Sequence, residues 1–146
     1  MHYVTSGNGE PVILIHGLFG NLDNLKSLGI SLEADFQVIR VDVPNHGLSE
    51  HWHTMDYPTL AKAVIDLIDQ LGFDCVKLVG HSMGGKLAML LALTHHEYIN
   101  KLIVADIAPV NYPIEKQNIE ELRTVILHKV RDMYQIRFPY KTVYYS

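Results

Sequence analysis

The sequence has one cysteine, no apolar run long enough to cross a membrane, and no basic segment leading into an apolar core at its start. Cys75 cannot form a disulfide within the chain, which is typical of proteins from a reducing compartment. We therefore predict no signal peptide and a cytoplasmic location. Because Cys75 belongs to an apolar run, we expect it to be buried in a strand and not to act as a reactive thiol.

Charge of one sign is also scarce. The 146 residues include 12 basic and 16 acidic side chains, which gives a net charge of −4 when the histidines are neutral. This balance gives no electrostatic reason to expect binding to nucleic acid or to an anionic membrane. The length predicts one domain, and an apolar content of 48% indicates a globular protein with a real core.

Apolar runs of strand length alternate with segments of helical periodicity. The expected strands cover residues 12–15, 37–41, 75–79 and 101–105, and the expected helices cover residues 22–32, 58–71 and 83–95. Asn21 or Asn24 could cap the first helix, and Gly72 is expected to end the second. This alternation predicts an α/β fold with a mostly parallel sheet flanked by helices.

Ligands of such sheets bind beyond the carboxyl ends of the strands. Four residues with polar or turn-forming character each follow an expected strand: Gly17, Asp42, Ser82 and Asp106. Because the carboxyl ends of parallel strands meet at one edge of a sheet, we expect all four to gather there.

The most informative segment is a serine between two glycines, Gly80-His81-Ser82-Met83-Gly84. A G-x-S-x-G sequence between a strand and a helix matches the nucleophile elbow, a turn so tight that the serine backbone is strained. The glycines leave room for the neighbouring strand and helix, and the hydroxyl lies at the positive end of the helix dipole. Ser82 is therefore the candidate nucleophile.

A second glycine turn, His16-Gly17-Leu18-Phe19-Gly20, follows the first expected strand. A serine hydrolase stabilises its oxyanion with two backbone N–H groups, one from the residue after the nucleophile and one from such an earlier loop. The candidate donors are the main-chain amides of Leu18 and Met83, whatever their side chains. The alternative is that both motifs are ordinary glycine turns of an α/β protein.

Taken together, four segments resemble the α/β-hydrolase family, and within it the YbfF-like serine esterases. They are residues 16–20, 45–49, 80–86 and 106–110, in the order found in the family. The resemblance implies a Ser–acid–His triad that attacks small-molecule carboxylic esters or thioesters through an acyl-enzyme on Ser82, without a metal or a cofactor. Asp106 matches the position of the acid. Its other interpretation is a cap for the turn before Pro109.

The resemblance covers residues 11–110 and departs from the family after about Gln117. It implies a partial α/β-hydrolase fold, in which residues 1–110 are the N-terminal part of the core and residues 111–146 begin a helical cap region and an atypical tail. The cap helix is expected within residues 114–137. The family places its catalytic histidine in the unmatched half, so we expect a truncated chain that lacks it. Residues 102–104 would then form an exposed apolar sheet edge that promotes self-association.

Other histidines could replace the missing base. His81 adjoins Ser82, but adjacent side chains point apart, and in the family His16 is a structural residue of the oxyanion turn. His46 is expected to stabilise its own loop, and His128 lies beyond the resemblance. We also expect no metal site, because the remaining histidines that lie close in sequence lack a Cys, Asp or Glu partner at ligand spacing: His51, His53, His95 and His96.

Two functions remain open at this point. The first is a serine hydrolase of carboxylic esters or thioesters, and the second is an inactive truncated fragment that at most binds acyl ligands or a partner chain. A serine at position 82 disfavours epoxide hydrolases and dehalogenases, which carry aspartate at the elbow. The lack of a G-x-G-x-x-G pattern disfavours a dinucleotide-binding module.

Overall fold

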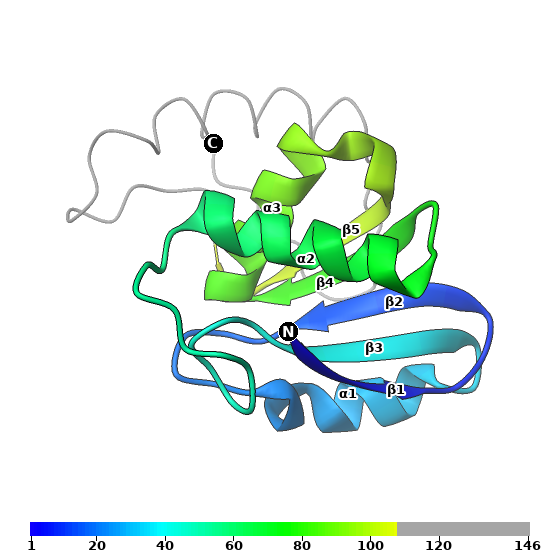
Figure 1. Cartoon of the computed structure of the whole chain (residues 1–146). Helices are drawn as coiled ribbons and strands as arrows, with labels where there is room; N and C mark the ends of the chain where they lie inside the picture. Colours follow the sequence, from blue (N-terminus) through cyan, green and yellow to red (C-terminus); the bar gives the residue numbers. More distant parts are fainter. Residues whose placement is uncertain (108–146) are drawn as a thin grey trace, which may run out of the picture.

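Within residues 1–107, five strands form one sheet in the order β1-β3-β2-β4-β5 (Figure 1). The computed structural model describes residues 1–107. The strands are β1 (His2–Ser6), β2 (Glu10–Ile15), β3 (Phe36–Asp42), β4 (Val76–His81) and β5 (Ile99–Ala105). β2 runs parallel to both β3 and β4, and β4 runs parallel to β5. The predicted α/β fold with a mostly parallel sheet is confirmed.

The first strand is the exception to the parallel order. β1 pairs antiparallel with β3, and His2 lies opposite Asp42. This strand was not predicted, because its side chains are partly buried or exposed and do not form an apolar run. The β-branched and aromatic residues before the Gly7 turn were the available signal.

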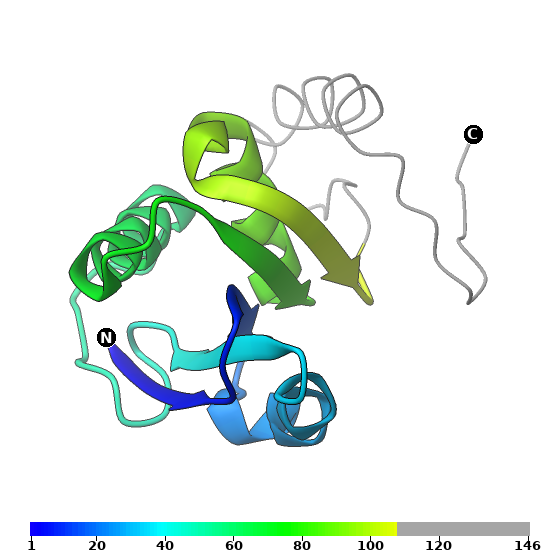
Figure 2. The ribbon, with the colours of Figure 1, turned by 90° about the vertical axis from the view of Figure 1, so that its right-hand side faces the viewer.

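Helices cover both faces of the sheet. Helices α2 (Tyr57–Leu71) and α3 (Met83–Thr94) lie on one face, and α1 (Lys26–Leu32) lies on the other (Figure 2). The Asp56 side chain accepts the Thr59 amide at 2.8 Å to begin α2, and Gly72 ends that helix with a φ of 72°. Both ends agree with the sequence pattern.

Each face has its own apolar core. Alternate strand residues such as Ile13 and Leu78 pack toward α2 and α3, whereas Leu14 and Val79 pack toward α1. Strands that are covered on both faces read as continuous apolar runs, which is why these strands could be predicted. A fully buried aliphatic side chain contributes about 1.5–3 kcal/mol relative to an exposed one, so these two cores stabilise the sheet that carries the site.

Two local predictions need correction. The expected helix over residues 22–32 is divided into a 3₁₀ turn, η1 (Leu22–Leu25), and α1, with Asn21 as the cap of η1 and the Asn24 side chain accepting the Asn21 amide. Cys75 is exposed and not buried, because β4 begins one residue later, at Val76. A short 3₁₀ turn, η2 (His96–Tyr98), leads from α3 into β5.

The strand at the far edge is less exposed than expected. In β5, Leu102 is buried because its side chain packs into the core beneath α2 and α3, whereas Ile103 is 37% exposed. The predicted boundary at residue 110, the cap segment 114–137 and His128 lie outside the described residues.

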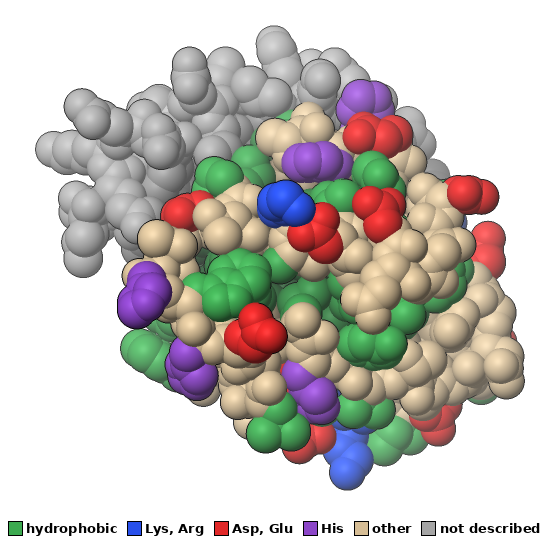
Figure 3. Space-filling model, viewed as in Figure 1, with side chains coloured by type: hydrophobic (Ala, Val, Ile, Leu, Met, Phe, Trp, Pro, Cys, Tyr) green, Lys and Arg blue, Asp and Glu red, His purple; other side chains and the backbone are tan. Residues whose placement is uncertain are grey.

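None of the helices within residues 1–107 combines the length and apolar character of a membrane span. On the face drawn in Figure 3, charged side chains are scattered and no basic patch gathers.

Candidate active site

The strand ends converge as the parallel topology requires. Ile15 at the end of β2 lies opposite both Val41 of β3 and Gly80 of β4. His81 at the end of β4 lies opposite Ala105 of β5. The segments that follow these four strands therefore share one edge of the sheet. They include Leu18, Ser82, Met83 and Asp106, and Asp42 is the last residue of β3 at the same edge.

Ser82 occupies the sharp turn between β4 and α3. Its backbone has φ 52° and ψ −117°, a conformation that is strained for a residue with a Cβ atom. The Ser82 amide donates to the Ala105 carbonyl at 2.9 Å, and the Ser82 carbonyl accepts the Gly85 amide at 2.8 Å. Although Ser82 is the N-cap of α3, its hydroxyl does not cap the helix. The predicted strained turn is confirmed.

The elbow glycines are required by close backbone contacts. A Cβ atom on Gly80 would lie 2.2 Å from the Gly84 carbonyl oxygen, and one on Gly84 would lie 2.4 Å from the Ile15 carbonyl oxygen. These contacts are with main chain and not with the ends of flexible side chains. Helix α3 therefore packs against β4 and β2 at a distance that only glycine permits.

The loop after β2 lies against the serine. A Cβ atom on Gly17 would lie 3.2 Å from the Ser82 Cβ atom, so the loop passes directly beside the elbow. The Gly20 amide donates to the Gly17 carbonyl at 3.0 Å, which closes the turn that contains Leu18 and Phe19. Phe19 has a φ of 61° and is 93% exposed. The amides of Leu18 and Met83 belong to the two segments that meet at Ser82.

The two buried histidines of this edge have structural contacts. His16 is fully buried, with Nδ1 2.7 Å from the Gly17 carbonyl oxygen and Nε2 accepting the Val43 amide at 3.2 Å. Burial lowers the pKa of His16, which keeps the ring neutral. His46 lies 5.1 Å from the His16 ring, and its Nδ1 is 3.1 Å from the Pro44 carbonyl oxygen. With both of its nitrogens engaged, His16 cannot accept a proton from Ser82.

His81 and Asp106 form a pair beside the serine. His81 Nε2 lies 3.4 Å from Asp106 Oδ2, and both side chains are solvent-accessible. Asp106 follows β5 with a φ of 56°, so it turns away from the strand direction immediately after the Ala105 carbonyl that binds Ser82. The Asp106 carboxylate therefore lies at the correct sheet edge. Within residues 1–107, no hydrogen bond joins the Ser82 hydroxyl to a histidine.

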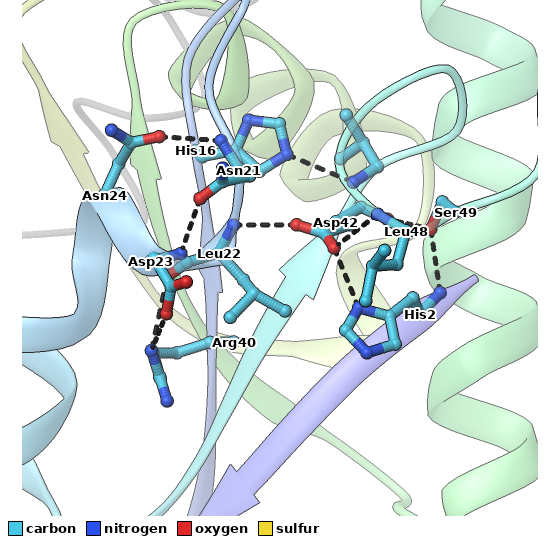
Figure 4. A network of polar contacts seen from close by, with 11 residues as sticks. His2, His16, Asn21, Leu22, Asp23, Asn24, Arg40, Asp42, Leu48 and Ser49 are labelled. Carbon is cyan, nitrogen blue, oxygen red and sulfur yellow. Dashed lines mark hydrogen bonds and ion pairs between the residues drawn. The ribbon is translucent and has the colours of Figure 1, made fainter.

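Sequence reasoning did not identify the contacts of Asp42, the last residue of β3. Its carboxylate accepts the Leu22 amide at 2.7 Å and the Leu48 amide at 2.9 Å, and it lies 2.8 Å from His2 Nδ1 (Figure 4). The position of Asp42 at a strand end was the only local signal, since its partners come from three separate segments.

Within residues 1–107, no three His, Cys, Asp or Glu side chains are arranged to hold a metal ion.

Comparison with known proteins shows the family of this chain. The profile of the alpha/beta hydrolase fold matches residues 10–134. The chain belongs to the α/β-hydrolase family. It is 43% identical over 111 residues to Esterase YbfF of Escherichia coli strain K12, an alignment that covers 76% of this chain and 44% of the relative.

Solved structures of α/β hydrolases agree with the fold. A marine microorganism esterase superposes with a TM-score of 0.75 and 38% identity, covering 86% of this chain and 49% of that protein. The epoxide hydrolase CorEH superposes with a TM-score of 0.71 and 32% identity, covering 77% of this chain and 42% of that protein. The chain spans less than half the length of these curated relatives: 44% of Esterase YbfF and 39% of a putative esterase/lipase from Haemophilus influenzae.

Proposed function

We propose that this chain carries the nucleophile, the acid and the oxyanion donors of a serine esterase that acts on small-molecule carboxylic esters or thioesters. The observation that carries the proposal is the strained turn at Ser82, whose hydroxyl does not cap α3. A backbone strained in this way persists only where the surrounding structure determines it, and such strain clusters at active sites. The similarity to Esterase YbfF gives independent support for the ester class of substrate.

In the proposed reaction, Ser82 Oγ attacks the carbonyl carbon of the substrate and a base accepts the hydroxyl proton. The amides of Leu18 and Met83 donate to the oxyanion, and the positive end of α3 stabilises the same charge. Collapse of the intermediate breaks the bond to the alcohol or thiol, which leaves with a proton and gives an acyl-enzyme on Ser82. Water then hydrolyses the acyl group. None of these steps requires a metal or a cofactor.

The proposed function also requires a proton acceptor for Ser82. Asp106 is proposed to orient and charge-stabilise a histidine, as the acid of the triad. His16 is excluded because Gly17 and Val43 engage both of its ring nitrogens. His81 pairs with Asp106 at 3.4 Å and is the exposed histidine nearest to the elbow in sequence. We keep His81 as the candidate within residues 1–107 for slow turnover by this chain.

The second candidate is a non-catalytic protein that binds acyl ligands or a partner chain. The chain spans 44% of Esterase YbfF, and no histidine within residues 1–107 is bonded to the Ser82 hydroxyl. Loss of the triad base in a serine protease lowers turnover by about 10⁶-fold, so a folded elbow is compatible with very low activity. Similarity to an epoxide hydrolase does not favour that chemistry here, because the elbow residue is serine.

A cytoplasmic location stays a prediction.

A fluorophosphonate probe tests the proposal. We expect the full chain to form a covalent phosphonyl adduct, which peptide mass spectrometry places on Ser82, and we expect Ser82→Ala to form none. Hydrolysis of p-nitrophenyl acetate and butyrate by the two proteins then measures turnover. A folded wild-type chain that forms no adduct would favour the non-catalytic candidate.

A further inference from the structure

Asp42 connects the segments that surround the elbow. It is 2% exposed at the carboxyl end of β3, and both of its carboxylate oxygens are used. One oxygen accepts the Leu22 amide, and the other accepts the Leu48 amide and lies 2.8 Å from His2 Nδ1 (Figure 4). A single buried side chain thus joins the loop after β2, the loop after β3 and the first residues of β1.

The loop after β2 is bonded at one end to the residue that follows β3 and at the other end to the last residue of β3. At the first end, the amide of Val43, which follows Asp42, donates to His16 Nε2 at 3.2 Å. At the second end, the Leu22 amide donates to Asp42 Oδ1 at 2.7 Å. Leu18 lies between these two bonds, so the position of its amide depends on both of them.

The local packing shows that a carboxylate is built into this position. A Cβ atom on Gly47 would lie 2.2 Å from the Asp42 carboxyl carbon, so the loop after β3 closes over the carboxylate at a distance that only glycine permits. The Ser49 hydroxyl donates to the main-chain carbonyl of Asp42 at 2.5 Å and accepts the His2 amide at 2.7 Å. The carboxylate of Asp42 is thus covered by the loop after β3, and its partners on the three joined segments are Leu22, Leu48 and His2.

On the basis of the proposed esterase function, we infer that Asp42 is a positioning residue that sets the Leu18 amide at the distance from Ser82 required to bind the oxyanion. It does not touch the substrate and takes no proton. Misplacing a catalytic group by about 1 Å can lower a rate by about 100-fold, so a modest shift of the loop is sufficient.

Asn at position 42 isolates this role, because it has the same shape but only one acceptor atom. Whichever way the amide is turned, its NH₂ group faces either the Leu22 amide or the Leu48 amide and His2, and one of these donors loses its acceptor. Leu22→Pro is a second variant, because proline removes the donor N–H itself at the first position of a helical turn, where proline is tolerated.

Two controls separate positioning from stability. His2→Ala removes a partner of the same carboxylate and leaves both loop amides bonded. Asp23→Asn changes an exposed carboxylate on η1, next to Leu22. All variants are studied as the full chain at a temperature where circular dichroism shows each one to be folded. The measured quantities are kinact and KI for phosphonylation of Ser82 by the fluorophosphonate, whose adduct places a phosphoryl oxygen at the oxyanion site.

We expect Asp42→Asn and Leu22→Pro to lower kinact by roughly 10- to 100-fold with KI within about twofold of the wild type. His2→Ala and Asp23→Asn should retain kinact within about twofold. Wild-type kinact in folded Leu22→Pro, which cannot donate to position 42 in any orientation of that side chain, would overturn the role of Asp42 and leave the esterase proposal intact. A loss of kinact in His2→Ala as large as that in Leu22→Pro would also overturn the role of Asp42. A wild-type chain that forms no adduct would overturn both proposals.

Discussion

The amide of Ser82 donates a hydrogen bond to the carbonyl of Ala105 at 2.9 Å. This bond joins the elbow to the end of β5, and Asp106 follows directly. The proposed nucleophile and the proposed acid are therefore joined by a main-chain contact between adjacent parallel strands. Any change that displaces the end of β5 is expected to displace both groups together.

The crowded glycines of the elbow give a prediction on stability. Gly84→Ala would place a Cβ atom 2.4 Å from the Ile15 carbonyl oxygen, so we expect a loss of about 3 kcal/mol or more in the free energy of unfolding. Gly72→Ala is the matched control, because its φ of 72° is unfavourable but no atom lies within 4 Å, and it should lose only about 1–2 kcal/mol. Urea unfolding measures both values. Equal losses would show that crowding is not what selects glycine at position 84.

The core on the α2 and α3 face gives a second prediction. Leu91 of α3 is fully buried, so Leu91→Ala should lower the free energy of unfolding by about 2–5 kcal/mol through lost burial and a new cavity. Ile30 of α1 is 56% exposed, and Ile30→Ala should change it by less than about 1 kcal/mol. Urea unfolding of the two variants checks this contrast. A small effect at Leu91 would contradict the assignment of this face as the main core.

Acid stability should depend on Asp42 and His16. Burial opposes the charged form of Asp42, but the Leu48 and Leu22 amides and His2 outweigh it, and the pKa of Asp42 lies below its ordinary value. The pKa of His16 is also lowered, but here burial is the cause, because it disfavours the charged imidazolium. For each group, the pKa in the unfolded chain is higher than the pKa in the folded chain. The contribution of each group to the free energy of unfolding is therefore complete above its unfolded pKa and is lost as the pH falls through its folded pKa.

The pH dependence can be measured by urea unfolding between pH 8 and pH 3, a range that spans the unfolded pKa values of about 6.5 for histidine and about 3.9 for aspartate. Asp42→Asn should lower stability near neutral pH and flatten the loss in the most acidic part of the range, where the wild-type carboxylate becomes protonated. The loss that begins below about pH 6.5 should persist in this variant, because His16 is unchanged. An unchanged acidic slope in Asp42→Asn would exclude Asp42 as its source.

The edge formed by β5 gives a prediction on association. Within residues 1–107, β5 pairs only with β4, and its Ile103 side chain is 37% exposed. Unpaired strand edges associate readily, so we expect the full chain to self-associate in sedimentation velocity experiments at high protein concentration. Ile103→Lys should reduce the association, whereas Ile30→Lys, on exposed α1, should not. A monomeric wild-type chain would exclude this edge as an association site.

Local sequence patterns were sufficient for much of the fold and for the elbow. β2 and β4 are buried on both faces and read as apolar runs, and the glycines around Ser82 mark a turn that no other residue permits. β1 was not predicted because an edge strand is only partly buried and has no such run. Cys75 was wrongly placed because it directly precedes β4, which begins at Val76.

The contacts of Asp42 could not be predicted for a different reason. His2 lies 40 positions away in sequence, and the Leu22 contact is made by a main-chain amide, which leaves no trace in residue identity. Likewise, the pairing of His81 with Asp106 depends on how β5 aligns with β4. Sequence patterns identify side chains whose chemistry suits a site, whereas the partners of these side chains are determined by strand order and register.

The antiparallel direction of β1 has a practical consequence for handling this protein. Because His2 lies opposite Asp42, the first residue of the chain emerges at the rim that carries Ser82, while the turn at Gly7 lies at the opposite rim. An affinity tag or fluorescent fusion joined to Met1 would therefore extend from the same side of the molecule that an ester has to approach. Such a tag should be cleaved before any rate is compared between variants.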